Sequence, residues 1–192
     1  TYVTASAGNH GMSVAAGAWA FGAMVVIYIS QTVPESFADR LRAEGADVVR
    51  EGEIYETSMA AAAQAAEDQG WRLLSDSSWQ GYTEPPLRVM EGYLALMAEA
   101  VEQVPAVPSH IFLQAGVGGL AAACAAFARQ AWGDAPRIVV VEPAFAPALH
   151  GSIAAGCPVE SSGPVSEMGR LDCKMPSLIA LKGLARDADA YA

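Results

Sequence analysis

The chain has 192 residues, of which 53% are hydrophobic and 17% are charged, and its formal net charge is −10. This composition indicates a densely packed globular protein and argues against disorder. The acidic balance argues against a nucleic-acid partner, and glycines interrupt the most apolar stretch, so we expect no membrane span. Three widely spaced cysteines indicate neither a disulfide framework nor a metal site, and there is no signal peptide, so we expect a cytoplasmic protein.

Strand and helix patterns alternate along the chain. Short apolar or β-branched runs bounded by Gly, Asp or Pro predict strands, which we expect at residues 2–5, 23–29, 47–50, 72–74, 110–114 and 137–141. Longer runs between them predict helices at residues 10–21, 35–44, 56–69, 87–103 and 119–132. After Pro143 the pattern fades, and we expect a long structured loop through SSGPVSEMGRLDCKMPS with no closing element.

The alternation predicts an α/β fold with parallel sheets and helices on both faces. The stretch WQGYTEPP contains turn residues, aromatics and two prolines, and it is the best candidate for a boundary. We expect a small α/β lobe at residues 1–82 and part of a larger α/β lobe at residues 83–192.

Two glycine-rich turns each lie between a predicted strand and a predicted helix. The turn QAGVGGLAAA, residues 114–123, exposes backbone N–H groups at a helix start, where an anion such as phosphate can bind without Lys or Arg. The same turn also matches the dinucleotide pattern G-x-G-x-x-A through Gly116, Gly118 and Ala121, with Glu142 as the ribose-binding acid. A third interpretation is close helix–strand packing without a ligand.

The other turn, SAGNHG, comprises residues 6–11 and adds hydroxyl, amide and imidazole groups to the bare backbone. Such a set suits a ring with polar substituents and a carboxylate better than it suits a pyrophosphate. Taken singly, Asn9 could also be a helix cap and His10 a surface or core residue.

Four stretches in this order, TASAGNHGMSVA, SDSSWQGYTEPPLRVMEGYLALMAEAVEQ, PSHIFLQAGVGGLAAA and IVVVEP, resemble the fold-type II pyridoxal-phosphate enzymes, and most of all the diaminopropionate ammonia-lyases. The resemblance extends from Thr1 to about Asp187. It implies two parallel-sheet lobes of the tryptophan synthase β-like kind, here incomplete. It also implies pyridoxal 5'-phosphate as the cofactor and a small amino acid as the substrate, with elimination giving a keto acid and ammonia.

The resemblance assigns roles to residues of both turns. Asn9 would contact the phenolic oxygen of the cofactor, and the phosphate would be held by Gly116, Val117, Gly118, Gly119 and Leu120. The substrate side would be lined by Ser6, Ala7, Gly8 and His10. Asp76 would be the catalytic acid–base group, although it could also be a turn residue. No metal site is implied, and a homodimer is expected.

The lysine that forms the Schiff base with the cofactor has no counterpart here. The chain contains two lysines, Lys174 and Lys182, and neither precedes the first glycine turn, where these enzymes keep theirs. We therefore expect a fragment that begins inside a strand, lacks the N-terminal lysine region and the C-terminal part, and is inactive alone.

Two residues depart from the diaminopropionate pattern. The lyases carry Asp directly before the G-N-H-G run, where this chain has Ala7, and an acid is expected at Met175. A serine/threonine dehydratase-like activity therefore remains an alternative, as does the dinucleotide-binding Rossmann module.

Overall fold

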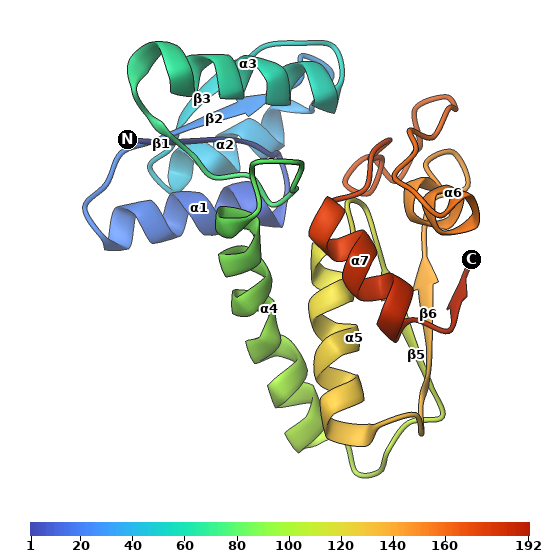
Figure 1. Ribbon diagram of the computed structural model, residues 1–192. Coiled ribbons are helices and arrows are strands. Elements are labelled where there is room, and N and C mark those ends of the chain that lie inside the picture. The colour runs from blue at the N-terminus through green and yellow to red at the C-terminus, as the bar shows by residue number, and fades with distance from the viewer. The chain divides into compact units, whose positions relative to one another are not determined.

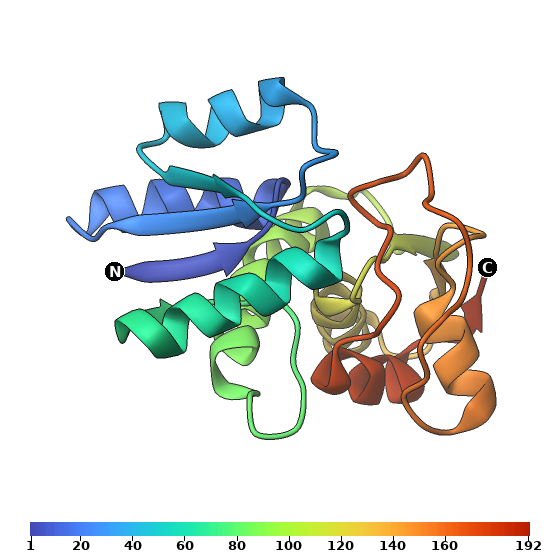
Figure 2. The same ribbon diagram turned by 90° about the horizontal axis from the view of Figure 1, so that it is seen from above.

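The computed structural model describes all residues from Thr1 to Ala192, which form two compact units (Figures 1 and 2). The first unit is Thr1–Ser75 and the second is Asp76–Ala192. Each unit is an α/β arrangement with its own parallel sheet, as the alternating sequence pattern predicts. The predicted lobe limits at residues 82 and 83 stay a prediction.

Unit 1 contains a four-stranded parallel sheet in the order β3-β2-β1-β4. Its strands are β1 (Tyr2–Ala5), β2 (Val25–Ile29), β3 (Asp47–Arg50) and β4 (Arg72–Leu73). Its helices are α1 (Asn9–Ala20), α2 (Glu35–Ala43) and α3 (Tyr55–Gln69). The central strand β1 pairs Val3 with Val26 on one side and with Leu73 on the other. Because β1 is central, the turn that follows it lies in the middle of the carboxyl edge of the sheet.

Helices cover both faces of this sheet. On one face, α1 and α2 pack through Ala15 and Leu41 against Ile27 of β2. On the other face, α3 packs through Ala62 against Val3 of β1 (Figure 1). Strands buried on both faces read as continuous runs of apolar residues, which explains why their sequence shows no polar alternation.

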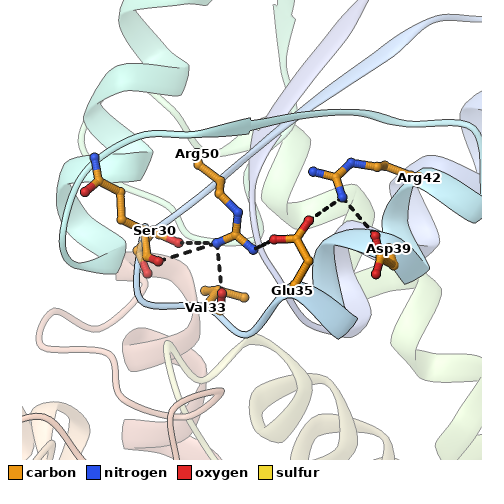
Figure 3. A network of polar contacts seen from close by, with 7 residues as sticks. Ser30, Val33, Glu35, Asp39, Arg42 and Arg50 are labelled. Atoms are coloured by element: carbon orange, nitrogen blue, oxygen red, sulfur yellow. Dashed lines mark hydrogen bonds and ion pairs between the residues drawn. The ribbon is translucent and has the colours of Figure 1, made fainter.

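The polar connections after β2 and β3 are joined by an arginine (Figure 3). Arg50, the last residue of β3, donates to the carbonyl oxygens of Ser30 and Val33 at 3.4 and 2.8 Å and to the Glu35 carboxylate at 2.5 Å. Arg42 donates to the same carboxylate at 2.6 Å, so that two guanidinium groups hold the pKa of Glu35 below its usual range. The network fixes the start of α2 at the carboxyl edge of the sheet.

Unit 2 contains a three-stranded parallel sheet in the order β5-β6-β7. Its strands are β5 (His110–Gln114), β6 (Arg137–Val141) and β7 (Ala190–Tyr191). Its helices are α4 (Glu84–Gln103), α5 (Gly119–Trp132), α6 (Ala148–Ala155) and α7 (Leu178–Asp187). The buried core joins Met97 of α4, Ala121 of α5, Ile138 of β6 and Leu184 of α7.

Two expectations for this unit were wrong. The segment after Pro143 was expected to have no closing element, but it contains α6, α7 and β7; the loop predicted at SSGPVSEMGRLDCKMPS, residues 161–177, is present between α6 and α7. The helix α4 begins at Glu84 instead of residue 87, because proline is tolerated in the first helical turn, where its missing N–H costs no hydrogen bond.

Two kinds of feature are absent from residues 1–192. None of the helices combines the length and the apolar character that crossing a membrane would require. No group of three or more His, Cys, Asp or Glu side chains is placed to hold a metal ion.

Candidate functional site

The first candidate site is the SAGNHG turn between β1 and α1. Gly8 is the N-cap of α1 and makes no side-chain cap, so the predicted alternative of Asn9 as an ordinary cap does not apply. Asn9 is the first residue of the helix, and its side chain is exposed. A Cβ atom on Gly11 would lie 2.2 Å from the Ser6 carbonyl oxygen, so this turn requires glycine. The geometry leaves the Asn9 amide available to a ligand.

His10 belongs to the same turn but is only 7% exposed. Its Nε2 lies 2.9 Å from the Leu74 carbonyl oxygen and 3.2 Å from the Thr4 hydroxyl. Since a carbonyl can only accept, Nε2 carries the hydrogen and donates to Leu74. His10 therefore ties the turn to the residue that follows β4. The substrate-side role that the resemblance assigns to Ser6, Ala7, Gly8 and His10 stays a prediction.

The second candidate site is the turn between β5 and α5. Gly118 is the N-cap of α5 with φ +98°, a conformation that favours glycine. A Cβ atom there would lie 3.1 Å from Leu149 and 3.3 Å from Ala180. A Cβ atom on Gly116 would lie 3.0 Å from the Cys173 sulfur. The backbone of Gly118 thus favours glycine, and a side chain at Gly116 would need the Cys173 side chain to shift.

This turn has the properties of an anion site. No side chain caps the helix, and no acidic residue lies in its first turn. The first N–H groups of a helix lack intrahelical partners and lie at the positive end of its dipole, so they favour negative charge. Residues 116–120, which we call the cradle, therefore suit a phosphate group, and the fit depends on bare backbone at Gly116 and Gly118.

Asp76 lies beside this cradle within unit 2. A Cβ atom on Gly119 would be 3.7 Å from the Asp76 carbonyl oxygen and 3.9 Å from the Tyr93 ring. Burial, together with the Asp76 charge, raises the pKa of Tyr93 to about 12. Asp76 is partly exposed, and its backbone carbonyl lies beside the start of α5. Its catalytic role stays a prediction.

Glu142 has a structural role that the sequence did not reveal. Its two carboxylate oxygens accept the backbone N–H groups of Leu149 and His150, each at 2.8 Å, at the start of α6. Burial raises the pKa of Glu142 above its usual value, although these backbone bonds partly offset the rise. Glu142 therefore has a structural role at the start of α6, which accounts for this acid without a ribose and weakens the dinucleotide interpretation.

The family model described as "Pyridoxal-phosphate dependent enzyme" matches residues 1–192. Diaminopropionate ammonia-lyase of Salmonella typhimurium is 35% identical over 187 residues, covering 93% of this chain and 46% of the relative. L-threonine ammonia-lyase of Geobacter sulfurreducens is 30% identical over 176 residues, covering 92% of this chain and 42% of the relative. The chain thus spans about half the length of the curated relatives it matches.

Solved structures agree with these matches. Diaminopropionate ammonia-lyase from Escherichia coli, in complex with an aminoacrylate-PLP azomethine reaction intermediate, superposes with a TM-score of 0.93 at 29% identity, covering 99% of this chain and 49% of that chain. Threonine deaminase isoform 2 from Solanum lycopersicum gives a TM-score of 0.86 at 25% identity, covering 100% of this chain and 53% of that chain. The expected fold, of fold type II and incomplete, is confirmed.

Proposed function

Because the chain belongs to the family of pyridoxal-phosphate dependent enzymes, we propose that the protein is an ammonia-lyase that uses pyridoxal 5'-phosphate and acts on a small amino acid such as 2,3-diaminopropionate. The observation that carries the proposal is the cradle, where two closely packed glycines and an uncapped helix start suit a phosphate. The reaction removes the α-proton and the β-amino group, and hydrolysis then gives a keto acid and ammonia.

The residues of the chain divide this work between binding and proton transfer. The backbone N–H groups of the cradle would hold the phosphate of the cofactor, and by the resemblance the exposed Asn9 amide would contact its phenolic oxygen. The bound cofactor supplies an electron sink for the negative charge that develops at the substrate α carbon. Asp76, which precedes α4 and whose backbone lies beside the start of α5, would hold and move a proton at its carboxylate.

The Schiff-base lysine is proposed to lie outside residues 1–192. Lys182 is exposed on α7, and the Lys174 ammonium is engaged by the oxygens of Phe145, Pro164 and Asp172. On this basis residues 1–192 alone are expected to be inactive. The homodimer and the cytoplasmic location are part of the same proposal.

A serine/threonine dehydratase-like activity is the second candidate. The observation that favours it is Ala7, which puts a methyl group where the resembling diaminopropionate lyases carry a carboxylate. The match to L-threonine ammonia-lyase at 30% identity supports the same alternative.

The test is ammonia release by the full-length protein with and without pyridoxal phosphate. We expect kcat/KM to be higher for 2,3-diaminopropionate than for L-serine and L-threonine. A higher value for L-threonine or L-serine would favour the dehydratase alternative. Release that does not depend on pyridoxal phosphate, or no release from any of these substrates, would contradict the proposed function.

A further inference from the structure

The segment between α6 and α7, residues 156–177, forms a long loop in unit 2 (Figure 2). Part of this loop packs on the cradle. A Cβ atom on Gly116 would meet the Cys173 sulfur at 3.0 Å and the Leu171 Cα at 3.4 Å. The Ser177 N–H donates to the Val117 carbonyl oxygen at 2.9 Å. The loop therefore supports two of the residues whose backbone would receive the phosphate.

Lys174 lies inside this loop, and its side chain is 16% exposed. The ammonium donates to the Phe145 carbonyl oxygen at 2.8 Å, the Pro164 carbonyl oxygen at 3.1 Å and the Asp172 carboxylate at 2.6 Å. An ammonium has three hydrogens, enough to donate to each of these three acceptors. The acceptors come from three separate stretches of chain, so one side chain joins them.

The loop also has backbone bonds of its own, such as that from the Cys173 N–H to the Leu171 carbonyl oxygen at 2.9 Å. It contains no helix or strand, and ordering a long loop of this kind costs much conformational entropy. The Lys174 carbonyl oxygen also accepts the Ser161 N–H at 2.8 Å, which closes the loop on itself. Removing the ammonium would leave the Asp172 carboxylate, 11% exposed, without its cation. An uncompensated buried charge is strongly destabilising, so the loop would rearrange.

We propose that Lys174 is a positioning residue for phosphate binding: its ammonium holds residues 170–174 against Gly116 and thereby keeps the cradle in its binding conformation. Lys174 acts through the loop and does not touch the ligand. The identity of the ligand rests on the proposed function, but the positioning role concerns any phosphate bound at residues 116–120.

The expected effect follows from the population of the binding-competent cradle. If loss of the ammonium leaves the cradle ordered in about one molecule of ten, the apparent Kd for phosphate rises about 10-fold. If Lys174 acted only by long-range attraction of the phosphate, the variants would change the Kd differently. Neutralising Asp172 would then tighten phosphate binding, whereas loss of positioning weakens it.

The test is calorimetric titration of the full-length protein with inorganic phosphate and with pyridoxal phosphate. For Lys174→Met and Asp172→Asn we expect the Kd of both ligands to rise about 10-fold. Lys174→Arg, which keeps the charge and the donors, should restore most of the affinity. Lys182→Met, the matched control, removes the other lysine of the chain from an exposed site on α7 and should leave the Kd within about twofold of the parent.

A second readout separates positioning from general stability. Hydrogen exchange of the peptide that contains Val117 and Gly118 should speed up in Lys174→Met and slow again in saturating phosphate. If that variant does not fold, Asp172→Asn and Lys174→Arg carry the test. A Kd in Lys174→Met equal to that of the parent, or tighter binding in Asp172→Asn, would overturn the positioning role. A parent protein that binds no phosphate would instead refute the cradle itself, and with it the proposed function.

Discussion

The Nε2 atom of His10 donates to the carbonyl oxygen of Leu74 at 2.9 Å, across 64 residues of sequence. The bond joins the turn after the central strand β1 to the residue that follows the edge strand β4. Nearly all of the His10 side chain is buried. The imidazole thus fixes the turn from which Asn9 extends.

Replacing His10 with alanine should destabilise unit 1. The substitution leaves the Leu74 carbonyl oxygen without its side-chain donor, and we expect a loss of about 1–3 kcal/mol in the free energy of unfolding. Urea unfolding of the parent protein and of His10→Ala measures this loss of unfolding free energy. His110→Ala is the control, because His110 is exposed at the start of β5 and should change stability by less than about 0.5 kcal/mol. Equal losses in the two variants would show that the buried contact contributes nothing.

Replacing Gly118 with alanine should weaken phosphate binding. Its φ of +98° is unfavourable for a residue with a Cβ, and the added methyl would press on Leu149 and Ala180. A left-handed conformation costs roughly 1–2 kcal/mol, which corresponds to a rise of about 10-fold in Kd. Gly92→Ala in α4 is the control, since a Cβ there meets nothing within 4 Å. Calorimetry with inorganic phosphate should separate the two variants, and equal Kd values would refute the predicted role of Gly118.

Acid should weaken the attachment of β7 through Asp189. The Ile138 N–H and then the Arg129 guanidinium hold the pKa of this carboxyl below its usual range. A depressed folded pKa stabilises the protein above the unfolded value of about 3.9, and the contribution is lost as the pH falls through the folded value. Asp189→Asn should therefore flatten the decline of the unfolding free energy below about pH 4. Glu102→Gln, at an exposed position on α4, is the control. If the unfolding free energy of Asp189→Asn falls with acid as steeply as that of the parent, the role given to Asp189 is wrong.

Ala7 should determine how the full-length enzyme treats the two enantiomers of diaminopropionate. Removing an α-proton needs a base on the face to which that proton points, and a positioned base contributes roughly 100- to 10,000-fold in rate. With a methyl group at residue 7 we expect strong preference for the L-isomer. Ala7→Asp should raise ammonia release from the D-isomer, whereas Ala7→Asn, of similar size but without a base, should not. Comparable rates on both isomers in the unmodified enzyme would show that residue 7 is not the position of the base.

Local patterns in the sequence predicted most of the fold. The strands β1, β3, β5 and β6 have the predicted limits, because apolar β-branched runs end at turn residues. The helices α6 and α7 were missed, since Gly151 and Gly183 interrupt them and weaken the helical pattern. The available signal for α7 was the pair Leu181 and Leu184, three residues apart and both buried.

The candidate site divides in a similar way. The cradle could be predicted from Gly116 and Gly118 in the sequence, because glycine is favoured where the backbone approaches its neighbours closely. The contacts of Lys174 have no such signal. Two of its three acceptors are backbone carbonyl oxygens, of Phe145 and Pro164, which any residue type could supply. The capping role of Glu142 depends on α6, a helix that was not predicted.

The most direct test of the central claim is a crystal structure of the full-length protein with pyridoxal phosphate. We predict that the phosphate lies within hydrogen-bond reach of the backbone N–H groups of residues 116–120, with Gly118 still in its left-handed conformation. Phosphate density at any other place, with the turn between β5 and α5 empty at saturating cofactor, would contradict the claim.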